Sequence, residues 1–202
     1  EGESFMKWLV ISDVHSAIHD FPTVNAQEKL IDQIKREGKK KPFDFVLITG
    51  DCMDKCSDPE QAIKYIISIK DACKIDRNHI FICPGNHDIA RPTNKDPKED
   101  TQRVKLIKEL RNGRLDIVSS LSLDGKNAFP WRDTYGVFSD MYKAIKGCSY
   151  EPFEFFEPEG ENYRILSIDS CMFSMDDNDA GHLYVSVPKL MMQFAKMKND
   201  NK

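Results

Sequence analysis

Short apolar runs alternate with amphipathic stretches along the first half of the chain. Apolar runs predict strands over 8–11, 43–49 and 80–83, each of which ends at polar residues. Between these runs, apolar positions at helical spacing predict helices over 25–37 and from Pro59 onward. Strands that alternate with helices favour a mostly parallel sheet with right-handed crossovers.

Capping residues define where we expect these helices to begin and end. Asn25 is a candidate N-cap for the first helix, and Gly38 is a candidate C-terminal stop. Asp58 followed by Pro59 is typical of a second helix start, and the pair Asp96-Pro97 predicts a third.

The second half of the chain has a different pattern. Aromatic residues over 153–156, a turn at 158–160 and an apolar run over 163–168 predict an antiparallel hairpin, so we expect a mixed sheet or a second sheet. The last predicted element is a helix over 188–197. Its inward-facing residues should be Leu190, Met191 and Phe194.

Composition places the chain among folded proteins. It has 202 residues, of which 40% are hydrophobic, and a formal net charge of −4. Its longest apolar runs have four residues, so we expect no membrane span and no membrane partner. The mild acidic balance argues against a strong nucleic-acid patch, and we interpret 39–41 as a solvated basic turn. A nucleotide substrate is still compatible with this charge.

The six cysteines are scattered and do not form a Cys-x-x-Cys pair. We therefore interpret them mainly as reduced thiols of a cytoplasmic protein. Residues 1–5 resemble a tag remnant, because Met6 is a natural start directly before the first strand. The predicted domain accordingly covers 6–202.

Potential metal ligands follow three predicted strands. They stand in Asp13-Val14-His15, in Gly50-Asp51 and in Gly85-Asn86-His87-Asp88. Because the carboxyl ends of parallel strands share one edge of a sheet, we expect these groups to lie together. Asp13, His15, Asp51 and Asn86 offer oxygen and imidazole ligands, which suit Mn²⁺, Fe or Zn²⁺, and less selectively Mg²⁺. Two such ions would clamp a phosphate and generate hydroxide at neutral pH.

Each of these motifs alone is also compatible with an ordinary turn. The three motifs in this order, each directly after a predicted strand, favour the metal centre.

In this combination the sequence closely resembles the calcineurin-like metallophosphoesterase superfamily, from Met6 to the end of the chain. The resemblance implies an α/β fold, an α-β-β-α sandwich with mixed sheets around a dinuclear metal centre. It also implies that Asp13 and His15 bind the first metal, that Asp51 bridges both metals, and that Asn86 binds the second. His87 would protonate the leaving oxygen, and Asp88 would orient His87.

The chain departs from the family pattern after His87. The family has later histidine motifs, whereas this chain has only His182 there, in Gly181-His182-Leu183-Tyr184. We interpret that segment as an imitation of the last motif. We therefore expect the C-terminal part of the fold to be missing, the chain to be an N-terminal portion of a longer protein, and further domains to be fused to it. The fragment alone would then hold the second metal poorly.

The expected activity is metal-dependent phosphoester hydrolysis. Protein Ser/Thr phosphatases of the superfamily carry Gly-Asp-x-Val-Asp-Arg-Gly, which 50–56 do not match, and a third motif ending in Glu where this chain has Asp88. Together with the strand carrying Asp169-Ser170, this resembles the phosphodiesterase-type branch, with a small phosphoester or nucleotide as substrate. The alternatives are a phosphomonoesterase of the same fold and a degenerate domain acting as a binding or regulatory module.

Overall fold

Three parallel strands form the centre of the structure. In the computed structural model they are β1 (Trp8–Ile11), β2 (Phe45–Ile48) and β3 (Ile80–Ile82), in the order β1-β2-β3. The parallel arrangement follows from the crossover helices between them, as the alternating pattern predicts. The structure describes residues 5–16, 21–90, 101–114, 133–151, 155–157, 163–174, 185 and 187–199.

Every residue of the three strands is apolar. Because alternate residues of a strand point to opposite sides, both faces of the sheet are apolar. Val46, Ile48 and Ile82 belong to the larger core on one side. Phe45 and Phe81 belong to a smaller aromatic cluster on the other side. The sheet therefore needs a covering layer on each face.

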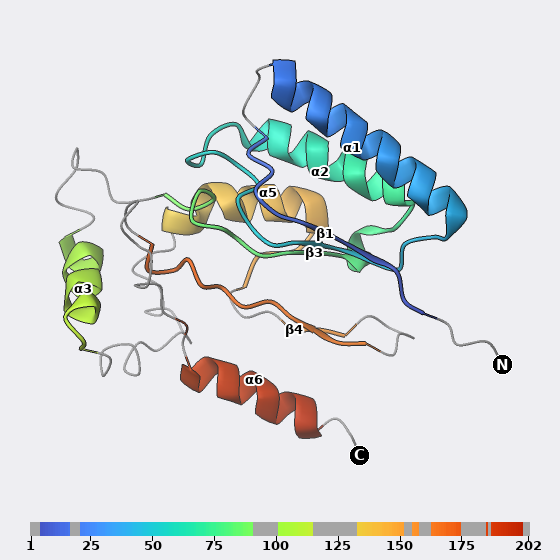
Figure 1. Cartoon of the computed structure of the whole chain (residues 1–202). Coiled ribbons are helices and arrows are strands. Elements are labelled where there is room, and N and C mark those ends of the chain that lie inside the picture. The colour runs from blue at the N-terminus through green and yellow to red at the C-terminus, as the bar shows by residue number, and fades with distance from the viewer. Residues whose placement is uncertain are drawn as a thin grey trace.

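Helices α1 (Phe21–Lys40), α2 (Pro59–Cys73) and α5 (Gly136–Lys146) lie together on one face of the sheet (Figure 1). The second helix begins as its sequence predicts: the Asp58 side chain accepts a hydrogen bond of 3.2 Å from the Gln61 backbone amide, and Pro59 is the first helical residue. Two short 3₁₀ turns, Arg77–His79 and Asp133–Tyr135, precede β3 and α5.

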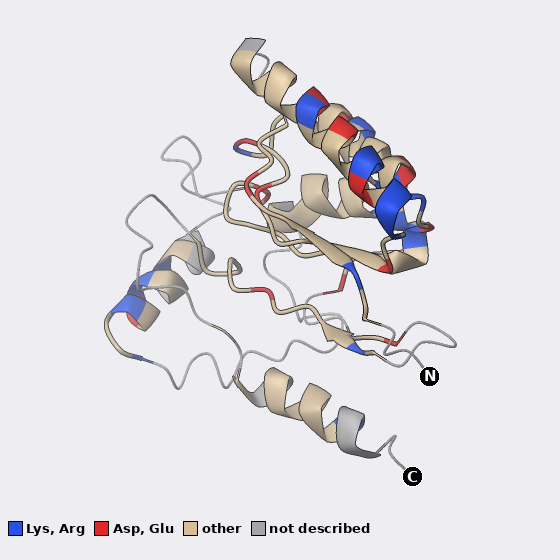
Figure 2. Cartoon of the chain, turned by 45° about the vertical axis from the view of Figure 1, so that its right-hand side comes forward, with Lys and Arg blue, Asp and Glu red and all other residues tan. Residues whose placement is uncertain are grey.

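On the other face, an antiparallel hairpin of β4 (Phe155–Phe156) and β5 (Ile165–Leu166), the pairing that the sequence predicts, packs on β2 and β3. Trp8 and Val10 of β1 are both 52% exposed. Ring contacts join the two layers, with centroid distances of 4.8 Å between Phe45 and Tyr163 and 5.0 Å between Phe81 and Phe156. Helix α6 (Val187–Asn199) lies on the far side of the hairpin in Figures 1 and 2. This layering is the predicted α-β-β-α order.

Two predicted ends of the first helix are wrong. The helix begins at Phe21 rather than after Asn25, and it continues past Gly38 to Lys40. Gly38 does not adopt the positive φ of a helix stop, and the Lys41 amide still donates to the Glu37 carbonyl at 3.2 Å, as in a continuing helix. Helix α3 (Thr101–Arg111) follows the predicted third start at 96–97, which lies outside the described residues.

The expected inward face of the last helix is also wrong. Met191 is 61% exposed and Phe194 is 43% exposed, whereas Leu190 is half-buried. Periodicity showed that this helix has an apolar face but could not show what that face contacts. Helix α5, for which the sequence analysis gave no prediction, is in contrast buried through Phe138, Met141 and Tyr142.

Basic and acidic residues are interleaved along α1 (Figure 2). Lys40 and Glu37 form an ion pair at 2.8 Å, and Lys35 lies 3.8 Å from Asp32. All six cysteines lie in the described part of the chain and are free thiols, as predicted. Among the described helices, none combines the length and apolar character that crossing a bilayer requires.

A buried carboxylate joins α5 to the segment after the hairpin. Asp169 is fully buried and accepts hydrogen bonds from the hydroxyls of Tyr135 (2.7 Å) and Tyr150 (3.0 Å). It also accepts bonds from the backbone amides of Cys171 (3.0 Å) and Met172 (3.1 Å). Burial raises the pKa of Asp169 above its ordinary value, and these bonds act in the opposite direction. The Cys171 thiol also donates to Asp169, at 3.3 Å, so one side chain satisfies five buried donors.

We expect Asp169→Ala to lower the free energy of unfolding by about 3 kcal/mol or more, because several buried donors lose their acceptor at about 1–3 kcal/mol each. Urea unfolding followed by circular dichroism measures this change. Asp169→Asn keeps an acceptor oxygen and serves as the matched variant, with a smaller loss. An equal loss in both variants would contradict the hydrogen-bond explanation.

The same pair of proteins tests the pKa of Asp169. Because the folded-state pKa is raised, the folded protein binds more protons than the unfolded chain between the two pKa values. The free energy of unfolding of the natural chain, minus that of Asp169→Asn, should therefore fall as pH rises through the folded-state pKa. Unfolding free energies measured across the acidic to neutral range check the sign, and a rising difference would refute it.

Candidate metal centre

The loops that follow β1 and β2 are joined by backbone hydrogen bonds. The amide of Asp13 donates to the Gly50 carbonyl at 3.2 Å, and the amide of His15 donates to the Asp51 carbonyl at 3.0 Å. The ladder continues at Ser16, whose amide and hydroxyl both donate to the Cys52 carbonyl. These bonds bring two predicted ligand motifs to one edge of the sheet, as the strand order requires.

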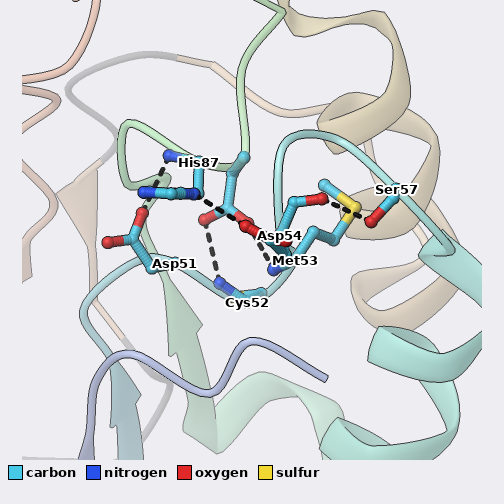
Figure 3. Close-up of polar contacts among 7 residues, drawn as sticks. Asp51, Cys52, Met53, Asp54, Ser57 and His87 are labelled. Carbon is cyan, nitrogen blue, oxygen red and sulfur yellow. Dashed lines mark hydrogen bonds and ion pairs between the residues drawn. The ribbon is translucent and has the colours of Figure 1, made fainter. Parts of the chain in front are cut away.

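The loop after β3 closes on the same point. The backbone amide of His87 donates to Asp51 Oδ1 at 2.9 Å (Figure 3). Gly85 makes this approach possible, because a Cβ placed there would collide with the Asp51 backbone amide and carboxylate, lying 2.7 Å from its Cγ. A Cβ on Gly50 would in turn lie 2.7 Å from the Gly85 amide nitrogen. The glycines in both motifs are therefore steric requirements of the site.

Three candidate ligands have left-handed backbones. The φ angles are 54° at Asp13, 41° at His15 and 53° at Asp51. Residues other than glycine adopt this conformation at a cost of about 1–3 kcal/mol each, and such residues gather at functional sites. The surrounding hydrogen bonds hold this unfavourable geometry in place.

Two groups of potential ligands result. In the first, Asp13, His15 and Asp51 each offer one ligand atom, and these atoms lie within 4.8 Å of one another. The second consists of His15, Asp54 and His87 under the same limit. The first group brings together three of the four residues that the sequence analysis names as ligands, and the second joins His15 to Asp54 and His87.

Asp54 is a site residue to which the sequence analysis gave no role. Its Oδ1 lies 3.0 Å from Nδ1 of His87, and both side chains are partly buried (Figure 3). The signal for it was its place three residues after Asp51, in the same loop. The structure therefore pairs His87 with Asp54, whereas the sequence analysis assigned the orienting role to Asp88.

Asp88 instead ties two loops together. Its buried carboxylate accepts hydrogen bonds from the amides of Met53 (2.8 Å), Gly85 (2.9 Å) and Cys52 (3.1 Å). Burial raises the pKa of Asp88, while the three amide bonds oppose that rise. With its oxygens engaged by backbone amides, Asp88 positions the loops that carry Asp51, Asp54 and His87.

The other residues that the sequence analysis names are Asn86 and the histidine near the end of the chain. Asn86 is half-buried between Gly85 and His87, in the loop that reaches this edge, and its role as a ligand stays a prediction. His182 and the acidic run at 176–179 lie outside the described residues.

The donor chemistry fits divalent metal ions. Two carboxylates and one imidazole form a mixed oxygen and nitrogen set without thiolate, which suits Mn²⁺, Fe or Zn²⁺. The close approach of Gly85 and the hydrogen bond from the His87 amide fix one of these carboxylates, that of Asp51. The residues present therefore fit a metal centre.

This edge of a parallel sheet, with its acids and histidines, is typical of metal-dependent hydrolases. The sequence profile described as calcineurin-like phosphoesterase matches residues 6–183, and the chain belongs to that family. It is 29% identical over 197 residues to an uncharacterized metallophosphoesterase-like protein, YydB, of Bacillus subtilis (strain 168). That alignment covers 96% of this chain but only 39% of the relative. No solved structure matches the chain.

We expect Gly85→Ala to weaken Mn²⁺ binding by about tenfold or more, since misplacing a ligand should cost at least as much as losing an outer-shell partner. Titration calorimetry measures the affinity, and circular dichroism checks that the variant is folded. Gly136→Ala is the control, because a Cβ there meets nothing within 4 Å. Unchanged Mn²⁺ affinity in folded Gly85→Ala would refute the steric role of this glycine.

Proposed function

We propose that this domain hydrolyses phosphodiesters with the help of two divalent metal ions, and that His87 donates the proton to the leaving oxygen. The observation that carries the proposal is the His87–Asp54 pair beside the group Asp13, His15 and Asp51. Ions held at this edge would polarise a phosphoryl oxygen and lower the pKa of a water molecule.

The histidine pair supplies what the leaving group needs. Asp54 Oδ1, 3.0 Å from Nδ1, fixes the ring orientation of His87. The opposite nitrogen, Nε2, is then the atom that donates a proton to the departing oxygen. The His87 amide bond to Asp51 fixes the backbone of the same residue relative to the ligands.

Two departures from the protein phosphatases support a diester over a monoester. The acid at position 88 and the Asp169-Ser170 segment resemble the phosphodiesterase-type branch.

Substrate class is tested with bis(p-nitrophenyl) phosphate and p-nitrophenyl phosphate in the presence of Mn²⁺, using the natural gene product. We expect a higher kcat/KM for the diester. A higher value for the monoester would replace our proposal with the phosphomonoesterase, and turnover of neither would favour a binding or regulatory module.

The role of His87 is tested with diesters that differ in their leaving group. His87→Gln should lower kcat by about 10²–10⁴-fold for an alkoxide leaving group, the usual contribution of a general acid. The loss should be much smaller for p-nitrophenolate, which departs without a proton. His79→Gln is a matched control, because His79 forms a similar pair with Asp76 at 3.0 Å on an exposed turn. Equal losses for both leaving groups would refute proton donation.

A further inference from the structure

His15 belongs to both groups of potential ligands, so its imidazole lies between two candidate ion positions. We propose that the second group (His15, Asp54 and His87) is a separate Zn²⁺ site, and that Zn²⁺ there removes the proton donor and inhibits the enzyme. The binding part stands on geometry and ligand chemistry alone. The inhibition rests on the function proposed above.

The second group is richer than the first in the ligands that zinc prefers. Asp13, His15 and Asp51 give two carboxylates and one imidazole, and carboxylates suit hard ions such as Mn²⁺ and Mg²⁺. The second group gives two imidazoles and one carboxylate. Imidazole-rich sets favour Zn²⁺, and two histidines with one acid plus an open fourth position are a common zinc arrangement.

The geometry of the second group is close to what zinc requires. Asp54 Oδ1 and His87 Nδ1 are 3.0 Å apart, and ligands about 2.0–2.1 Å from a tetrahedral Zn²⁺ are separated by about 3.3 Å. The rings of His15 and His87 have centroids 4.9 Å apart and lie edge to face at 88°. All three residues are half-buried, so an ion can reach them without unfolding the loops.

Zinc in this group would act on the proton donor directly. Ligation would engage the His87 imidazole and the Asp54 carboxylate together, so neither would be available for its proposed role in catalysis. The site also takes His15 away from the first group, because the two groups share that side chain. Excess Zn²⁺ would therefore oppose both Mn²⁺ binding and proton transfer.

The binding test compares Zn²⁺ and Mn²⁺ affinities by competition with a chromophoric chelator. His87→Gln and Asp54→Asn should each weaken Zn²⁺ binding by about tenfold or more and change Mn²⁺ binding by less than about twofold. Asp13→Asn should do the reverse. His79→Gln, which removes a histidine from the exposed pair with Asp76, should change neither affinity.

Circular dichroism confirms that each variant is folded. His87→Gln and Asp54→Asn each test the proposed zinc site independently. Unchanged Zn²⁺ affinity in both folded variants would overturn the proposed site. Equal weakening of Zn²⁺ and Mn²⁺ would also overturn it, because the two groups would then be a single site.

Activity provides the second readout. In enzyme loaded with Mn²⁺, added Zn²⁺ should inhibit diester hydrolysis, and the Zn²⁺ concentration for half-inhibition should rise with the Mn²⁺ concentration because both ions use His15. Full activity with Zn²⁺ bound through His87 would overturn the inhibition. Absence of turnover with any metal would refute the proposed function. The zinc site would still be decided by whether the variants weaken Zn²⁺ binding without weakening Mn²⁺ binding.

Discussion

The contact between Asp51 and Gly85 is the constraint on which the site depends. With no side chain at position 85, the loop after β3 reaches the loop after β2 closely enough for the His87 amide to bond the Asp51 carboxylate. A methyl group at that point would separate the two loops. The motif glycines are therefore needed because a side chain would not fit, as much as for their backbone freedom.

Two buried carboxylates then hold the elements around this contact. Asp88 accepts three backbone amides from both loops, and Asp169 accepts two tyrosine hydroxyls and two amides. Burial raises the pKa of each, because a charged carboxylate loses favourable hydration when it is placed away from water. Several directed hydrogen bonds offset that cost, and they also fix the loops that an apolar side chain would leave unoriented.

Sequence reasoning could locate the ligand motifs because they depend on topology. Once β1, β2 and β3 are recognised as parallel, the residues that follow them must share one edge. The partner of His87 was not predictable in this way. Asp54 and Asp88 are both close to it in the fold, and the choice between them depends on loop conformation, such as the positive φ angles at 51, 55 and 56.

In the helices, too, some features follow from local sequence and others from the elements packed against them. The start of α2 was predictable, because Asp58, Pro59 and Gln61 act locally. Helix α5 had a readable apolar face in Phe138, Met141 and Tyr142, at spacings of three and four residues. The exposure of α6 was not readable, because burial depends on what lies opposite a helix rather than on its own sequence.

The hydrogen bond from His87 to Asp51 joins ligand and proton donor into one unit. Asp51 Oδ1 accepts the His87 amide, while Asp54 holds the ring of the same residue. A cation drawn to the Asp51 carboxylate would fix the oxygen that positions the His87 backbone. Metal occupancy and the position of the proton donor are therefore coupled through a single carboxylate, and any change that moves Asp51 must disturb both.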